Sequence, residues 1–211
     1  MDVKRNNQRI AQGEATRADL LAAGRRLFGE QGYAATSLDD VVAAAGVTKG
    51  ALYHHFGSKV ELFRAVFEQV SHEISDQVVA VFLEPGHFEA LSRGCQVLID
   101  AQLDPAVRRI VLHDARSVLD WDSLRAIETR YSAVGIRGAL RKAMQGGAIE
   151  RESLRPLALL LTGAINEACF YVADADDPEA AREEVRATVI RLLEGLRPHA
   201  HEEGEAVRVA G

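Results

Sequence analysis

Cysteine is scarce in this sequence, which has only Cys95 and Cys169 among its 211 residues. Two thiols cannot build a disulfide framework, and no C-x-x-C pair is present to indicate a zinc site. Both cysteines are therefore interpreted as small buried hydrophobic residues. The adjacent His54 and His55 do not indicate a metal site either, because neighbouring residues of a helix point about 100° apart.

Long apolar runs are also lacking. The longest, near 157–161, is interrupted by Thr162 and Gly163 and is too short to cross a bilayer. The basic amino terminus, MDVKRNNQRIAQGEATR, is not followed by the apolar stretch that a secretory signal requires. We therefore expect a cytoplasmic protein with no membrane partner.

Strand signals and catalytic motifs are missing as well. The sequence shows no sustained period-two alternation and no Asn-Gly hairpin turn, which favours an all-α fold. It contains no G-x-S-x-G, P-loop, H-E-x-x-H or strand-associated G-x-G-x-x-G motif. We expect no enzymatic activity, and hence no catalytic residues, and no cofactor or metal.

Charge is distributed unevenly along the chain. The net charge of -6 taken alone argues against a nucleic-acid partner. However, residues 1–64 carry nine Lys and Arg against seven Asp and Glu, a balance of +2, and the remaining residues carry a balance of -8. The chain therefore has a mildly basic head on an acidic body.

Signals for the start and end of helices are abundant. S/T-x-x-D/E patterns begin at Thr16, Ser37 and Ser58, each ahead of an apolar run. Gly32 and Gly46 are placed to end the first and second helices. Later helices are expected to start at Asp104-Pro105, Ser153 and Asp177-Pro178. The expected organisation is a flexible basic arm (1–15), a three-helix head (16–62), a helical body (63–198) and a tail (199–211).

The segment AGVTKGALYHHFGSK (45–59) is unusual for a buried helix, because only Leu52 and Phe56 are large and apolar at helical spacing. Helices over about 38–45 and 48–55, joined at Gly46, predict a helix-turn-helix, in which Thr48 caps the second helix. The small residues of that helix allow a close approach to the major groove of DNA. The residues expected at DNA are Thr36, Ser37, Thr48, Lys49, Gly50, Ala51, Tyr53, His54 and Lys59.

Within residues 20–67 the chain carries the pattern LF-x-E-x-GY-x-x-TS, then V-x-x-A-x-GV-T-K-G-x-LY-x-HF, then SK-x-x-LF. This stretch resembles the DNA-binding head of the TetR family of bacterial transcriptional regulators. The resemblance implies a homodimer with nine or ten helices per chain and a ligand pocket in the body. It implies a ligand-responsive regulator, which we expect to be a repressor that binds a palindromic operator and is released by a small molecule.

The body offers weaker signals. A ligand site needs an apolar cavity with a few convergent polar groups, and the candidates for it are His113, Arg116, Trp121, Tyr131, Asn166 and Phe170. In the alternative interpretation, Trp121 and Tyr131 belong to the core and the charged groups lie on the surface. A helix over about 153–173 is apolar around most of its circumference, so we expect it to pair with the helix over 178–196 in a homodimer interface.

Other interpretations of the head stay open at this point. It could be a plain helical hairpin inside a core, or it could bind a protein partner in a helical interaction protein with no DNA role. The arm that contains Lys4, Arg5 and Arg9 is either a disordered tail or an arm that reaches DNA.

Overall fold

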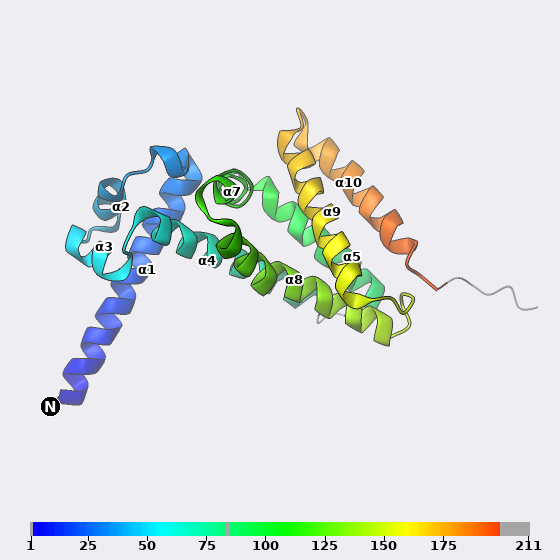
Figure 1. The fold of residues 1–211 in the computed structure, drawn as a ribbon, viewed down its shortest axis with the longest axis horizontal. Helices are drawn as coiled ribbons and strands as arrows, with labels where there is room; N and C mark the ends of the chain where they lie inside the picture. The colour runs from blue at the N-terminus through cyan, green and yellow to red at the C-terminus, as the bar shows by residue number, and fades with distance from the viewer. Residues whose placement is uncertain (1, 83–84, 199–211) are drawn as a thin grey trace, which may run out of the picture.

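The computed structural model describes residues 2–82 and 85–198, and regular structure in this part of the chain is helical throughout, as the sequence predicts. Three helices form a head at one end of the molecule: α1 (Asp2–Ala35), α2 (Leu38–Ala45) and α3 (Lys49–His55). Helix α4 (Lys59–Phe82) leaves the head and runs into the body (Figure 1).

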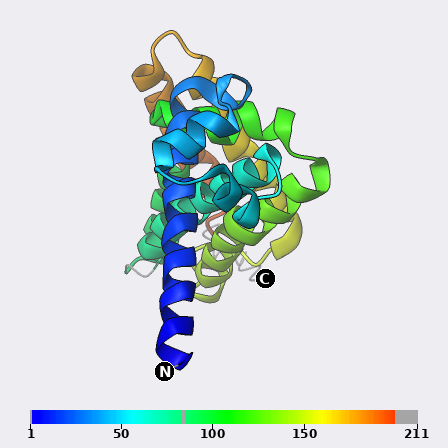
Figure 2. The ribbon, with the colours of Figure 1, turned by 90° about the vertical axis from the view of Figure 1, so that its left-hand side faces the viewer.

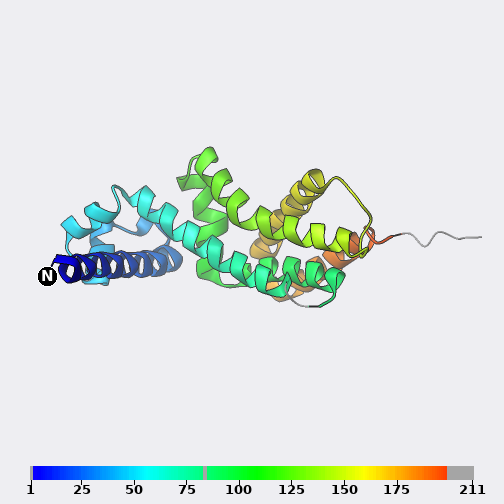
Figure 3. The same cartoon turned by 90° about the horizontal axis from the view of Figure 1, so that it is seen from below.

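The body is a bundle built around α4. It contains α5 (His87–Asp100), the 3₁₀ turn η1 (Ala101–Leu103), α6 (Pro105–Arg108), the π-helical segment η2 (Arg109–Asp114), α7 (Ala115–Val118), α8 (Trp121–Gln145), α9 (Leu154–Asp174) and α10 (Pro178–Glu194). Seen from below, the molecule is elongated, and α4 connects the head to the bundle (Figure 3). The expected tail over 199–211 lies outside the described residues.

Most of the expected helix ends are confirmed by the backbone. Asp104 accepts a hydrogen bond from the amide of Ala106, and Asp177 accepts one from Ala180, each with proline in the first turn. Gly32 has φ 85° and ψ 165°, which interrupts α1 three residues before it ends. Ser153 precedes α9 as expected, but its side chain makes no capping hydrogen bond.

The expected helix start at Thr16 is wrong. Helix α1 begins at Asp2 and passes through Thr16, whose hydroxyl donates to the carbonyl of Gln12 at 3.0 Å. A threonine inside a helix can make this bond to the preceding turn instead of capping. No proline or glycine precedes Gly13, so nothing in the chain stops the helix earlier. Residues expected to form a flexible arm therefore extend α1 beyond the head (Figure 2).

Two hydrophobic clusters hold the fold together. The head cluster includes Leu20, Phe28, Leu52 and Phe63, all fully buried. It continues past residue 62 into the body, where residues from α6 to the start of α8 join it: Val107, Ile110, Ala115, Leu119, Leu124 and Ile127. The body cluster joins α5, α8, α9 and α10 and contains both cysteines, which are buried as predicted.

A clamp of polar contacts joins the end of α1 to η2. Arg109 donates to the carbonyl of Gly29 at 3.1 Å and also to that of Glu30, and the amide of Tyr33 donates to Asp114 at 2.7 Å. The backbones lie close at this point, since a Cβ added to Gly29 would lie 2.6 Å from the Cβ of Ala106. Helix α1 is therefore held by the segment that follows η1 as well as by α4.

One face of the body carries large apolar side chains in contact with solvent. Leu160 is 72% exposed, and Tyr171 and Leu192 are more than half exposed. Helix α9 is long and apolar enough to cross a membrane by length and composition alone, a test that the core helix of a soluble protein also passes. Its opposite face is buried in the body cluster.

Candidate nucleic-acid interface and body cavity

The first helix of the predicted helix-turn-helix is capped as the sequence indicates. The hydroxyl of Ser37 accepts from the amide of Asp40 at 3.0 Å, and Asp40 accepts from the amide of Ser37 at 3.0 Å. This reciprocal capping box satisfies two amides that a helix start otherwise leaves unpaired. The Ser37 hydroxyl also donates to Asp40 and thereby lowers the pKa of that carboxyl, so the hydroxyl is engaged within α2.

The turn is formed by Gly46, which has φ 66° and ψ 27° in the left-handed region. Glycine adopts this conformation without a steric penalty. The side chain of Thr48 then accepts from the amide of Ala51 at 3.2 Å and caps α3. Leu52 and Phe56 point into the head cluster and leave the rest of α3 facing outwards.

The outward face of α3 is polar and small. Lys49, Gly50 and His54 are exposed, Ala51 is half-buried, and Tyr53 is 50% exposed. A Cβ added to Gly50 would meet only the hydroxyl of Thr48, at 4.0 Å. Packing within the chain therefore gives no reason for glycine here, whereas close approach of an external surface does.

Lys49 is paired inside the head. Its ammonium lies 2.7 Å from a carboxylate oxygen of Asp39 on α2, and this hydrogen bond raises the pKa of Lys49. Both groups are exposed, so solvent screens the pair and Lys49 can exchange this partner for a phosphate. The acidic partner was not among the residues singled out from the sequence.

Two of the expected DNA contacts need correction. Thr36 is only 1% exposed, and its hydroxyl donates to the carbonyl of Gly32 at 2.8 Å, so it supports the break in α1 instead of facing outwards. Lys59 is half-buried with its ammonium 4.1 Å from the centre of the Tyr33 ring. Burial lowers the pKa of Lys59, opposed by the charge of Asp114, and this inward orientation differs from the expected phosphate contact.

The two histidines have different surroundings. His54 is exposed, whereas His55 is half-buried and lines a groove that also contains Arg17 and Phe56. The rings are 5.1 Å apart and nearly perpendicular. His54 therefore faces outwards, and His55 lies beside Arg17 of α1.

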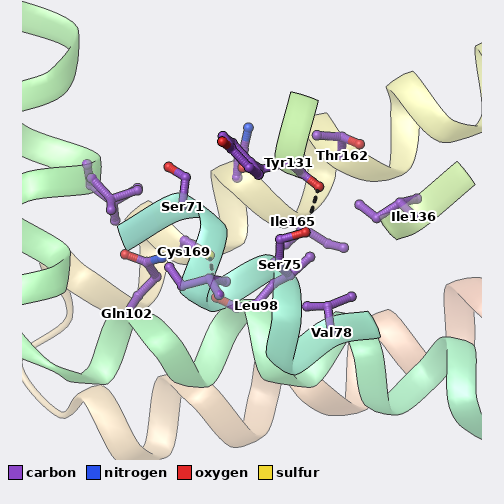
Figure 4. A pocket seen from close by; sticks show the side chains of 14 residues that line it. Ser71, Ser75, Val78, Leu98, Gln102, Tyr131, Ile136, Thr162, Ile165 and Cys169 are labelled. Carbon is purple, nitrogen blue, oxygen red and sulfur yellow. Dashed lines mark hydrogen bonds between the residues drawn. The ribbon is translucent and has the colours of Figure 1, made fainter. Parts of the chain in front are cut away.

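The body encloses a cavity of about 60 Å³ (Figure 4). It is lined by residues of α4, α5, η1, η2, α8 and α9, and most of these are apolar. Tyr131 and Asn166 are the two predicted ligand residues that line it. At one end lie Ser71 of α4 and Gln102 of η1, and at the other lie Val78 and Ile136.

The other predicted ligand residues lie elsewhere. His113 is exposed on η2, and Trp121 is 69% exposed at the start of α8, where the guanidinium of Arg125 covers it at 5.6 Å. Arg116 lies 4.3 Å from the ring centre of Phe170. Arg116, Trp121 and Asn166 line a second groove in the body, so the structure gathers three of the six candidates there and two, Tyr131 and Asn166, at the cavity.

Comparison with known proteins identifies both halves of the chain. Residues 20–66 match the family model described as "Bacterial regulatory proteins, tetR family", and residues 88–196 match the one described as "Tetracyclin repressor-like, C-terminal domain". The chain belongs to the TetR family. Members of this family are DNA-binding transcriptional regulators and not enzymes, so the interpretation of the head as a protein-binding module without a DNA role is not supported.

Individual TetR-family relatives agree with this assignment. The regulator TtgR of Pseudomonas putida is 34% identical over 154 residues, which cover 67% of this chain and 71% of that protein. The transcriptional repressor AcnR of Corynebacterium efficiens is 30% identical over 135 residues, covering 60% and 69%. The crystal structure of a TetR-family regulator from Pectobacterium atrosepticum superposes with a TM-score of 0.78 at 35% identity, covering 90% and 97% of the two chains.

Sequence reasoning found Tyr131 and Asn166 but missed the other polar residues of the cavity, among them Gln102, Ser71 and Ser75. Gln102 had a detectable signal, since it continues an apolar stripe formed by Phe88, Leu91, Cys95 and Leu98 at helical spacing. A polar residue on such a stripe is either paired or functional. Ser71 and Ser75 do not interrupt an apolar stripe in this way, because polar residues also occur on the other faces of α4.

Proposed function

We propose that this TetR-family regulator is a cytoplasmic repressor that binds a palindromic operator as a homodimer and is released when a small molecule enters the body cavity. The observation that carries the DNA-binding part is the open outward face of α3 around Gly50. A repressor role is supported by a relative that is named as a repressor.

The apolar face of α9 and α10 supports a homodimer. Leu160 and Leu192 are exposed on it, and a groove between the two helices is lined by Ala164, Ala168 and Val189. An apolar surface of this kind, continuous over two long helices, is typical of an interface. In the dimer, the two α3 helices enter successive major grooves about 34–36 Å apart, which requires an operator with two-fold symmetry.

The position of the cavity supports a coupling between ligand and DNA. Ser71, Ser75 and Val78 of α4 line it, and α4 also carries Phe63 of the head cluster. On its other side, Gln102 in η1 leads directly into α6 and η2, which clamp the end of α1. The head is thus attached to the body by two elements that both contact the cavity.

The small size of the cavity explains how a ligand could move the head. At about 60 Å³ it is smaller than the roughly 150 Å³ cavity known to admit benzene. A ligand with a ring must therefore displace lining helices, and any displacement of α4 or η1 moves the head. A ligand that prefers the displaced state weakens DNA binding by its differential affinity, typically about 1–3 kcal/mol.

Fluorescence anisotropy with labelled DNA from the region beside the protein's own gene tests the DNA-binding part. We expect specific binding to a two-fold symmetric segment, with log K falling by about 0.9 per phosphate contact for each unit of log salt. A symmetric operator with one half-site scrambled serves as the control. Equal affinity for the intact and scrambled operators, or no dependence on salt, would contradict the proposal.

The dimer is tested separately with Leu160→Glu. Leu160 is 72% exposed in the single chain, so the substitution leaves the core intact but places charges on the shared face. We expect a folded monomer by analytical ultracentrifugation and loss of operator binding. Trp121→Glu, which alters a similarly exposed apolar residue outside that face, is the matched control and should remain dimeric. If the Leu160 variant stays dimeric, the interface is elsewhere.

A further inference from the structure

The cavity in the body is electrically neutral. Among the described residues that line it there is no Lys, Arg, Asp, Glu or His. Burial raises the pKa of the Cys169 thiol to about 12, and burial together with the hydrogen bond to Glu68 raises the pKa of Tyr131. Both groups are therefore uncharged at neutral pH. An ion entering the cavity would lose its hydration without gaining an opposite charge, so the cavity favours an uncharged occupant.

Three of the hydrogen-bond donors that line the cavity are used by the protein itself, and the hydroxyl of Ser71 and the amide of Asn166 line it as well. The hydroxyl of Ser75 donates to the carbonyl of Tyr131 at 3.2 Å, and that of Thr162 donates to the carbonyl of Ala158 at 2.7 Å. The thiol of Cys169 points to the carbonyl of Leu98 at 3.8 Å. Two of these contacts are visible in the close view (Figure 4). These groups are committed to backbone carbonyls and have no proton left for a ligand.

Gln102 is different. Its side chain lines the cavity and is only 5% exposed, and its Oε1 atom has no hydrogen-bond donor among the described residues. Buried polar atoms in folded proteins nearly always have a partner. A glutamine held in an otherwise apolar stripe, with an acceptor that no neighbour satisfies, is suited to accept a hydrogen bond from a molecule inside the cavity.

We propose that the cavity binds an uncharged, mainly apolar molecule bearing a hydroxyl group, which donates its hydrogen bond to Oε1 of Gln102. This inference rests on the proposed ligand response and adds the chemical class of the ligand. The apolar residues of α4, α8 and α9 make van der Waals contact with the ligand, and Gln102 distinguishes a ligand with a hydroxyl group from an analogue without one. A site built to accept a hydrogen bond rejects an analogue that lacks the donor more strongly than a purely apolar pocket does.

The test uses three probes of nearly equal shape: 4-ethylphenol, its methyl ether 4-ethylanisole, and 4-ethylbenzoate. Their affinities for the full-length protein are measured by isothermal titration calorimetry at pH 7. We expect 4-ethylphenol to bind at least ten-fold more tightly than either analogue. Equal binding of the ether, tighter binding of the carboxylate, or no binding of any probe overturns the proposal without the need for a variant.

One substitution and its control test whether Gln102 causes the preference for the phenol over the ether. Gln102→Met keeps the length of the side chain but removes the acceptor, and we expect the phenol and the ether to bind this variant with affinities within two-fold of each other. Gln96→Met is the matched control, because Gln96 lies on α5 outside the cavity lining. A phenol preference that survives in Gln102→Met contradicts the assignment.

Operator binding without any probe is measured on the same preparations. A protein that binds its operator but not 4-ethylphenol refutes the ligand class alone. A protein that binds 4-ethylphenol with the expected preference but no operator refutes the proposed function instead.

Discussion

Replacement of Gly50 by alanine separates the stability of the head from its function. In the structure the added methyl group lies 4.0 Å from the hydroxyl of Thr48, an ordinary van der Waals contact, and φ at this position is not in the left-handed region. Glycine within a helix is less stable than alanine by about 0.5–1 kcal/mol. Because Gly50 is the second residue of α3, we expect a gain near the lower end, about 0.5 kcal/mol.

DNA binding should change in the opposite direction. If the α3 backbone lies against the groove at Gly50, the methyl group occurs at both recognition helices of the dimer and holds them away from the bases. We expect at least a ten-fold loss of operator affinity, which corresponds to about 1.4 kcal/mol. The protein would thus become slightly more stable and clearly less active, a combination that damage to the fold cannot produce.

The assays are thermal unfolding followed by circular dichroism and operator binding followed by anisotropy. Gly138→Ala is the matched control, since Gly138 lies inside α8 with nothing within 4 Å of an added Cβ. Its melting temperature should rise by about 2–4 °C for a gain of about 1 kcal/mol, with operator affinity unchanged. Wild-type operator affinity in Gly50→Ala would show that α3 does not approach DNA closely, and would refute the assignment of its outward face.

The head and the core give three further predictions. Lys49→Ala should leave the melting temperature unchanged, because Lys49 is exposed. It should reduce the slope of log K against log salt by about two per dimer, one for each lost phosphate contact. An unchanged slope would show that Lys49 contacts no phosphate. Asp39→Asn removes the carboxylate that pairs with Lys49, so operator binding should tighten at low salt and approach the wild-type value at high salt; weaker binding at low salt would refute this. Burial raises the pKa of Cys95 and Cys169 from 9.0 to about 12, so both thiols should resist Ellman's reagent at pH 8 until the protein unfolds. Rapid labelling of the native protein would contradict their burial. The contribution of these neutral thiols to the free energy of unfolding should be complete below pH 9 and be lost between pH 9 and about 12. The free energy of unfolding should fall less over this range when both cysteines are replaced by alanine.

The helix-turn-helix could be predicted from sequence because its determinants are local. Ser37 with Asp40, Gly46 in the turn and Thr48 before α3 each act on backbone groups within four residues. Capping and left-handed turns depend on the chemistry of those few residues and hardly at all on the rest of the fold. The same is true of Asp104 and Asp177, whose capping bonds are present as expected.

Sequence reasoning failed at residues whose side chains can adopt either of two favourable local arrangements. Thr16 can cap a helix or bond to the preceding turn inside one, and the run before it contains no proline and only one glycine, Gly13, which a helix tolerates at a small cost. Thr36 and Lys59 are polar residues at helix ends, where exposure is the usual outcome. Thr36 bonds instead to the carbonyl of Gly32 in the preceding turn, and Lys59 lies against the ring of Tyr33, 26 residues earlier in the chain.

The cavity shows the limit of sequence reasoning most clearly. Its lining comes from six elements between α4 and α9, and which side chains converge there depends on how the helices cross. Of the six residues expected at a ligand, Tyr131 and Asn166 line it, while Trp121 lies on the surface. Residue type indicated which groups could bind a ligand but not which way they face.

The sequence by itself determined the all-helical fold and the helix-turn-helix, because helical periodicity, caps and turn glycines express short-range physics in each segment, and its motif over 20–67 indicated the family by resemblance. Only the tertiary structure decided that Gln102 is buried with a free acceptor, that η2 clamps α1, and that one face of α9 remains open. Those features result from packing between helices far apart in the chain, where small differences in crossing angle decide whether a side chain is buried, paired or exposed.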